Sequence, residues 1–389
     1  MTVFDHAIDK VGGKPSQHTA HLNNLDGLQA FDTWPNILNS LNFQVDSSGS
    51  TSPHPLTLGP TVALLNAALP RTVVVGVPTG LQFTLSFDNS VLSSPIGAML
   101  EQAAKTAAGV YAMFFSNKEN IKIQVGYGEI GGYTMTPNYR CGVSHSLSYD
   151  YLNYATTVAA LKHDSGYSIY NQTANYFLPA KDPTATKVEA GTFRLTSAEE
   201  RALGLSGKTP AYDGQVGIAT IANAGAWALP VAGSNNLADP RSNDLTGVML
   251  HEISEIMGRV GFDGLFRDSN DPHYNPLYSP LDLFRFQDLS GSLGTGLLDI
   301  PFGDKKEGWA GLSFDGGDNI VNTYNDPQSW GASGEDLADW NATRNDAYGS
   351  NVSGQAEHIT AGDVIEDALL GYKLTAAGKA FILTPHAYP

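Results

Sequence analysis

A helix that carries polar residues inside an otherwise apolar run constrains this chain more than any other feature. Residues 245–259 read LTGVMLHEISEIMGR, with Asp244 before them at a position suited to a helix N-cap and Gly258 where a helix would end. Apolar residues lie on nearly every side of this helix, so we expect it to be buried. Three polar residues interrupt its middle: His251, Glu252 and Glu255.

The spacing of these three residues predicts a metal site. Residues four apart lie on one face of a helix, so His251 and Glu255 can converge on one ion. Glu252 lies about 100° further round, where its carboxylate can reach a water on that ion without binding the ion itself. A buried unpaired carboxylate is costly, so both glutamates need a cation, a proton or an arginine. Arg259, four residues after Glu255, is the alternative partner for one of them.

Composition narrows the classes of partner. The chain has 389 residues, and its 22 Lys plus Arg against 39 Asp plus Glu give a formal net charge of −17. Nucleic acids and anionic membranes need basic patches, so this balance argues against both and favours cations. The single Cys141 argues against a disulfide framework and a multi-cysteine metal site.

Sequence features also bear on location. No apolar run approaches the roughly 18 residues of a membrane span, so we expect none. The N-terminal residues lack the order of a cleaved signal peptide. The acidic, lysine-poor and cysteine-poor composition favours an extracellular location, reached without a cleaved signal, and leaves a cytoplasmic location open.

A change of pattern near residue 80 divides the chain. Residues 1–80 are polar and rich in proline, with a helix-like segment at Thr61–Leu69 and a strand-like segment at Thr72–Val77. We interpret residues 1–80 as an N-terminal extension or small non-catalytic domain, and residues 81–389 as the domain that carries the helix.

From Leu81 the pattern predicts regular structure. LQFTLSFD alternates as a strand, Pro95–Phe115 has helical spacing, and Ile121–Tyr127 alternates again, which together predict a βαβ unit. We therefore predict an α/β to α+β fold with a twisted mixed β-sheet, a long backing helix and a buried active-site helix.

Later segments add weaker signals. We expect a helix at Tyr149–Lys162 and another after the threonine cap at Thr360. The strand QVGIATIA after Asp213 is either an ordinary sheet strand or an edge strand that pairs with substrate backbone. DPQSWGASGEDLADWN, at residues 326–341, reads as a polar surface loop with solvated acidic residues.

Three motifs together carry a resemblance to a known family. HEISEIMGR, YSPLDLFRF at residues 278–286 and LSFDGGDNIVN at residues 312–322 resemble a family of bacterial zinc metalloproteases with an HExxE-x-MGR signature. The likeness covers roughly residues 81–375, and that family is itself metzincin-like. It implies a metalloprotease-like domain with His251 and Glu255 as zinc ligands and Glu252 as general base. It also implies that Gly258 lets the chain leave the helix.

The third ligand is where this chain departs from the metzincin pattern. The expected position is Gly261, which has no side chain. We predict Asp282 as the third ligand, because an aspartate inside an apolar, strand-like run needs a partner; its alternative is an ion pair or hydrogen bond with Arg259 or Arg285. Asp263 and His273 are further candidates. The loop with Asp268, Asn270 and Asp271 is either a solvated turn or a weak Ca²⁺ site.

The resulting functional prediction is a zinc-dependent endopeptidase that acts on a protein or peptide substrate. A metal-bound water would attack the peptide carbonyl, with Glu252 as general base. Tyr278 or Tyr274 would donate a hydroxyl to the oxyanion, or else has only a packing role. The alternative is a secreted structural or self-assembling protein that retains the peptidase fold without its activity, because Glu255 replaces the second histidine and the surface is poor in charge.

Overall fold

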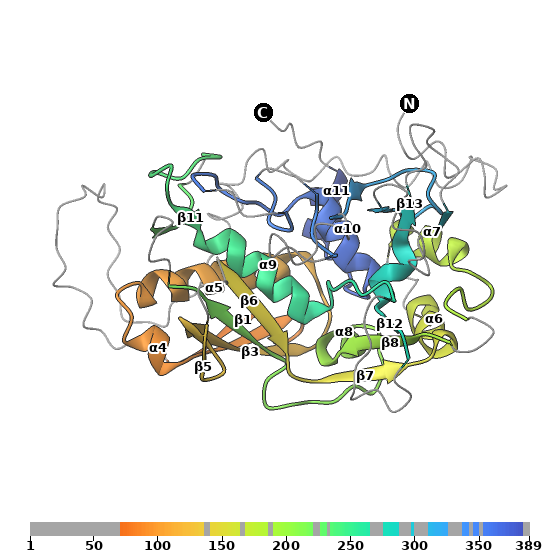
Figure 1. Ribbon diagram of the computed structural model, residues 1–389, viewed down its shortest axis with the longest axis horizontal. Coiled ribbons are helices and arrows are strands. Elements are labelled where there is room, and N and C mark those ends of the chain that lie inside the picture. The colour runs from red at the N-terminus through yellow and green to blue at the C-terminus, as the bar shows by residue number, and fades with distance from the viewer. Residues whose placement is uncertain are drawn as a thin grey trace.

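The chain forms a mixed α/β structure. The computed structural model describes residues 71–135, 141–163, 168–185, 190–220, 226–231, 234–264, 275–287, 297–298, 310–325, 337–341, 345–349 and 353–383. Within these residues there are eight α-helices and several small sheets (Figure 1).

The largest sheet has five strands in the order β1-β2-β3-β9-β6. These are β1 Thr72–Gly76, β2 Gln82–Phe87, β3 Asn120–Tyr127, β9 Gly214–Ile218 and β6 Gly142–Ser146. Strands β2, β3 and β9 are parallel, whereas β1 and β6 pair antiparallel with their neighbours. Alternation along β2 and β3 buries one row of apolar side chains: Phe83, Leu85, Phe87, Ile121, Ile123 and Val125.

Two helices pack on the buried face of this sheet. Helix α5, Gly97–Phe114, connects β2 to β3, and helix α9, Leu245–Met257, lies beside α5 and over β6 and β9 (Figure 1). The Tyr111 hydroxyl of α5 donates to the Leu250 carbonyl of α9 at 2.7 Å. A methyl group at Gly214 would lie 2.6 Å from Ile256 Cδ1, so this glycine lets α9 approach β9 closely.

The remaining elements surround this layer. Strands β7 Tyr149–Leu152, β8 Thr192–Thr196 and β12 Leu277–Tyr278 form one small sheet, and β13 Arg285–Gln287, β14 Leu297–Leu298, β15 Ala310–Leu312 and β16 Asn322–Thr323 form another. Two-stranded sheets join β4 Glu129–Ile130 to β5 Tyr133–Thr134 and β10 Trp227–Ala228 to β11 Asn243–Asp244.

The other helices are short. They are α4 Asn89–Leu92, α6 Tyr154–His163, α7 Ile169–Phe177, α8 Ser197–Ala202, α10 Ala361–Leu369 and α11 Ala376–Leu383, with a 3₁₀ helix, η3, at Pro280–Phe284. None of the helices in the described part of the chain has the length and apolar character of a membrane span.

Several predicted elements are present, and one needs correction. The βαβ unit and the helix after Thr360 are confirmed. The strand predicted at Thr72–Val77 is also confirmed, as β1, which pairs with β2 in the main sheet. The helix predicted from Tyr149 begins only at Tyr154, because the preceding residues pair with β8. Of the two alternatives for the strand after Asp213, the ordinary sheet strand is the one observed, because among the described residues β6 pairs with β9 and takes the edge position. The segment Thr61–Leu69 lies outside the described residues.

Candidate metal centre

Helix α9 has defined ends that fix its position. At its start the Asp244 carboxylate accepts a hydrogen bond from the Thr246 backbone amide at 2.8 Å, as expected for an N-cap. At its end Gly258 has φ +123°, a conformation that favours glycine. A methyl group at this glycine would also lie 2.8 Å from Glu199 Cδ. The chain can therefore leave the helix at Gly258, as the motif predicts.

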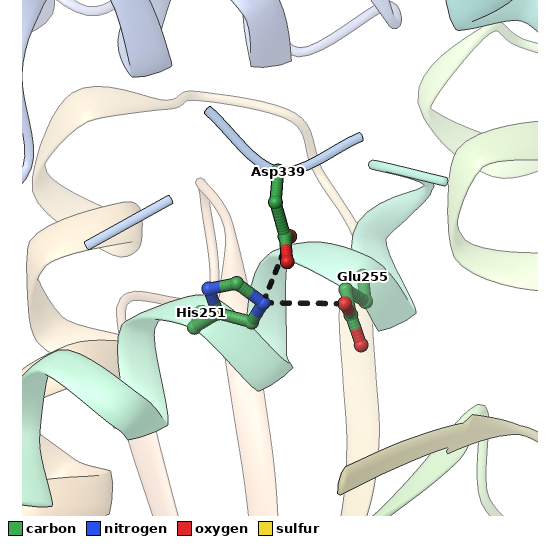
Figure 2. A group of neighbouring side chains, drawn as sticks. All are labelled: His251, Glu255 and Asp339. Atoms are coloured by element: carbon green, nitrogen blue, oxygen red, sulfur yellow. Dashed lines mark ion pairs between the residues drawn. The ribbon is translucent and has the colours of Figure 1, made fainter. Parts of the chain in front are cut away.

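His251, Glu255 and Asp339 converge on one point. The distance from His251 Nε2 to Glu255 Oε1 is 3.4 Å, and the distance from His251 Nε2 to Asp339 Oδ1 is 3.2 Å. All three ligand atoms lie within 4.8 Å of one another, with two residues on α9 and Asp339 approaching from a separate segment (Figure 2). Zinc bonds of about 2.0–2.1 Å place tetrahedral ligands roughly 3.3–3.4 Å apart. Both measured distances are close to that spacing.

The tautomer of His251 suits a metal ligand. Its Nδ1 lies 2.9 Å from the Ala347 carbonyl oxygen, which can only accept a hydrogen bond. Nδ1 therefore carries a proton, and Nε2 is the nitrogen that faces the two carboxylates. A backbone carbonyl in this position is a common way to orient a metal-binding histidine.

A network of buried arginines holds the segment that carries Asp339. Arg259, which is fully buried, donates to the Ala338 carbonyl at 3.0 Å and to Asp339 Oδ1 at 3.1 Å. Arg285, also fully buried, donates to the Leu337 carbonyl at 2.5 Å. Asp339 is therefore held in place by contacts that do not depend on a metal.

Gly261 makes room for the same segment. A methyl group at Gly261 would lie 3.0 Å from Leu337 Cβ and 3.3 Å from the Ala338 amide nitrogen. Gly261 occupies the position where the metzincin pattern has its third ligand. It thus lies directly against the segment that carries Asp339.

Arg259 also lies close to the second carboxylate. Its Nη2 is 3.6 Å from Glu255 Oε1, its Nε donates to Ser254 Oγ at 2.7 Å, and its guanidinium lies 4.4 Å from the centre of the Tyr348 ring. The alternative partner expected from the sequence is therefore present, and it contacts the same oxygens that face His251.

Glu252 lies between α9 and the edge strand. It is 6% exposed, and a methyl group at Gly142 of β6 would come within 3.0 Å of Glu252 Cδ. Burial raises the pKa of Glu252 well above its usual range, and the charge of Glu255 adds to that rise. A carboxyl group with a raised pKa beside a metal site is suited to proton transfer.

The pKa values of the other two helix residues depend on their partners. Burial alone would raise the pKa of Glu255, but the hydrogen bond and charge of His251, followed by the charge of Arg259, lower it. Burial opposes the charged form of His251, yet the charge of Asp339 raises the pKa of this imidazole well above its usual value. Without a metal the His251 imidazole is therefore positively charged, with a proton on each nitrogen. A metal ion would have to displace the proton on Nε2.

Asp282 has a different role from the one predicted. The sequence SPLDLF forms the 3₁₀ helix η3 rather than a strand. In this 3₁₀ helix Asp282 Oδ2 accepts hydrogen bonds from the backbone amides of Ser279 at 2.7 Å, Asp263 at 3.0 Å and Phe262 at 3.2 Å. A serine N-cap followed three residues later by an acid forms a capping box. This corrects the prediction of Asp282 as third ligand; Asp339 is the residue that lies with His251 and Glu255.

The other predicted residues lie outside this group of three or outside the described residues. Tyr278 is 2% exposed and its ring packs against Phe193, with centroids 5.8 Å apart, so the packing role is the one observed. Asp263 is buried beside η3. His273, Tyr274 and the proposed Ca²⁺ loop lie outside the described residues.

The sequence does not predict Asp339 as a ligand, because residues 326–341 have the composition of a polar surface loop. Asp339 is 4% exposed, and the neighbouring Leu337, Ala338 and Trp340 are fully buried. The apolar residues around the aspartate in LADW were the available signal, since a carboxylate among buried side chains needs a partner.

Comparisons of the chain with protein-family models, with curated proteins and with solved structures found no match. A function for this chain therefore has to be inferred from its own residues and geometry.

Proposed function

We propose that the chain is a zinc-dependent endopeptidase of metzincin-like fold, related to the HExxE-x-MGR metalloproteases. The observation that carries the proposal is the convergence of His251, Glu255 and Asp339. The two distances from His251 Nε2, 3.4 Å to Glu255 Oε1 and 3.2 Å to Asp339 Oδ1, are close to those between tetrahedral zinc ligands, and all three ligand atoms lie within 4.8 Å of one another. Three protein ligands with Glu252 alongside would suit a catalytic rather than a structural zinc ion, because this set would leave a fourth ligand position for water.

The residues of the chain can divide the reaction between them. A bound zinc ion would polarise the peptide carbonyl and lower the pKa of a bound water. Its positive charge would also lower the pKa of Glu252. Glu252 takes the proton of the attacking water and returns it to the leaving amine. Ala347 holds the His251 ring, and Arg259 holds Asp339, so neither ligand has to reorganise during the reaction.

Strand β6 is suited to bind the substrate. It forms the edge of the five-stranded sheet within the described residues, and Gly142 brings it against Glu252. An extended peptide that pairs with this edge would lie beside the metal ligands.

The competing proposal is a structural protein without catalytic activity. The contacts of Arg259 with both Glu255 and Asp339 favour it, because two carboxylates, one arginine and a protonated His251 form an electrically balanced cluster. In that case α9 would be held by ion pairs and no metal would bind.

A casein digestion assay distinguishes the two proposals. Glu252→Gln keeps the shape of the side chain and removes the base, so we expect cleavage to fall by about 10²–10⁴. A chelator should abolish cleavage by the wild type, and added zinc should restore it. The matched control is Glu101→Gln, a glutamate on α5 whose partner is Lys105. Equal cleavage by wild type and Glu252→Gln, or none by either, would argue against the enzyme.

A further inference from the structure

Ser144 links the edge strand to the metal ligands. It lies on β6, and its hydroxyl donates to Glu255 Oε2 at 2.5 Å. This is the length range of hydrogen bonds from a hydroxyl to a charged carboxylate, which are stronger than neutral ones.

The contact follows from the way α9 lies along β6. Alternate strand residues face the same side, so Gly142 and Ser144 both face the helix. Gly142 lies against Glu252, and Ser144 contacts Glu255 one helical turn further on. Along β6, Gly142 and then Ser144 thus lie opposite Glu252 and then Glu255 of α9.

The two oxygens of Glu255 have different partners. Oε1 faces His251 Nε2 at 3.4 Å and Arg259 Nη2 at 3.6 Å. Oε2 is turned away toward the Ser144 hydroxyl. A carboxylate that binds a metal through both oxygens would have to turn Oε2 away from Ser144 and toward the metal.

We propose that Ser144 is a positioning residue that holds Glu255 as a one-oxygen metal ligand, and so keeps the coordination number low and a position open for water. This role rests on the proposed metal site. Without Ser144 the Glu255 carboxylate can rotate, bind through both oxygens and occupy the position that the reaction needs.

Zinc affinity tests the proposal directly. Wild type, Ser144→Ala and Ser144→Thr are titrated with zinc against a chromophoric chelator. Loss of a group that orients a ligand weakens metal binding by about 10–100-fold, so we expect that loss in Ser144→Ala. Ser144→Thr keeps the hydroxyl on a residue that strands accommodate well, and should bind within a few-fold of wild type. The matched control is Ser146→Ala, on the same strand and the same face.

A spectroscopic measurement separates this role from a structural one. Cobalt in place of zinc absorbs visible light strongly at four-coordinate sites and weakly at sites with more ligands. We expect strong absorption in wild type and Ser144→Thr, and weak absorption in Ser144→Ala. A melting temperature recorded without metal reports any purely structural contribution.

Each outcome decides between the proposals. If wild type binds zinc and Ser144→Ala binds it equally well with an unchanged cobalt spectrum, the role of Ser144 is overturned and the metal site stands. The role of Ser144 is likewise overturned if Ser144→Ala only lowers the melting temperature of the metal-free protein. If wild type binds no zinc, the metal site and the role of Ser144 both fail.

Discussion

At the scale of single residues, one buried acid behind His251, Glu255 and Asp339 has a strongly raised pKa. Asp367 of α10 is buried, and its Oδ2 accepts the Tyr348 hydroxyl at 2.7 Å. Burial raises the pKa of Asp367 to about 8. Tyr348 also lies against Arg259, so this acid belongs to the layer that supports the ligands. The proposed metal ligands are therefore backed by a carboxyl group whose raised pKa favours the protonated form at neutral pH.

The pKa of Asp367 predicts how stability depends on pH. Its ordinary value is 3.8, so between about pH 4 and pH 8 the folded state binds a proton that the unfolded state has lost. Stability is then greatest below this range and falls as the pH rises through it. Asp367→Asn cannot ionise and keeps an acceptor for Tyr348. The difference between the free energy of unfolding of Asp367→Asn and that of wild type should therefore increase by on the order of 1.4 kcal/mol per pH unit across this range.

Urea unfolding at pH 5, 6, 7 and 8 measures this difference. A chelator is present throughout, so that metal binding does not change with pH. Because both proteins share all other ionisable groups, their difference isolates Asp367. A difference that stays constant with pH would contradict the assigned protonation.

At the scale of elements, the segment at residues 337–341 completes the site that α9 begins. Leu337 and Ala338 lie against Gly261, and the Trp340 indole donates to Asp363 of α10 at 2.6 Å. The Trp340 ring also stacks on Tyr324, with centroids 4.7 Å apart. Asp339, the proposed third ligand, is thus positioned by packing between a loop, α9 and α10 rather than by a motif within the helix.

This packing predicts the effect of a methyl group at Gly261. In Gly261→Ala the segment with Asp339 must move by a few tenths of an ångström, because its atoms lie 3.0–3.3 Å from the added carbon. We expect zinc affinity to fall by about tenfold while the fold is retained. The matched control is Gly80→Ala, where the nearest atom would be Val77 Cγ2 at 3.4 Å. Unchanged zinc affinity in Gly261→Ala would argue against this packing constraint.

At the scale of the whole molecule, the sequence predicted features that depend on residues near one another in the chain better than contacts between distant segments. The helical spacing of His251 and Glu255 brings both to one face, and the alternating strands around α5 form the expected βαβ unit. Asp339 could not be placed in the same way, because its approach depends on two buried arginines and on Gly261. The edge position of β6 likewise depends on pairing between segments far apart in the sequence.

Asp282 illustrates a limit of reasoning from burial. The sequence correctly indicated that this carboxylate needs partners, but it did not distinguish a metal from backbone amides. Three amides satisfy Asp282 Oδ2, whereas Asp339 Oδ1 faces a histidine and an arginine. Both aspartates are buried and have apolar neighbours in the sequence, and only the fold separates their roles.

The zinc content of the purified protein tests the central claim most directly. Wild type, Asp339→Asn and Asp282→Asn are supplemented with zinc, dialysed and analysed for metal per chain. We expect about one zinc in wild type and in Asp282→Asn, and little in Asp339→Asn, because the amide lacks the charge that binds zinc. Absence of zinc from the wild type, or equal zinc in wild type and Asp339→Asn, would contradict a metal centre at His251, Glu255 and Asp339.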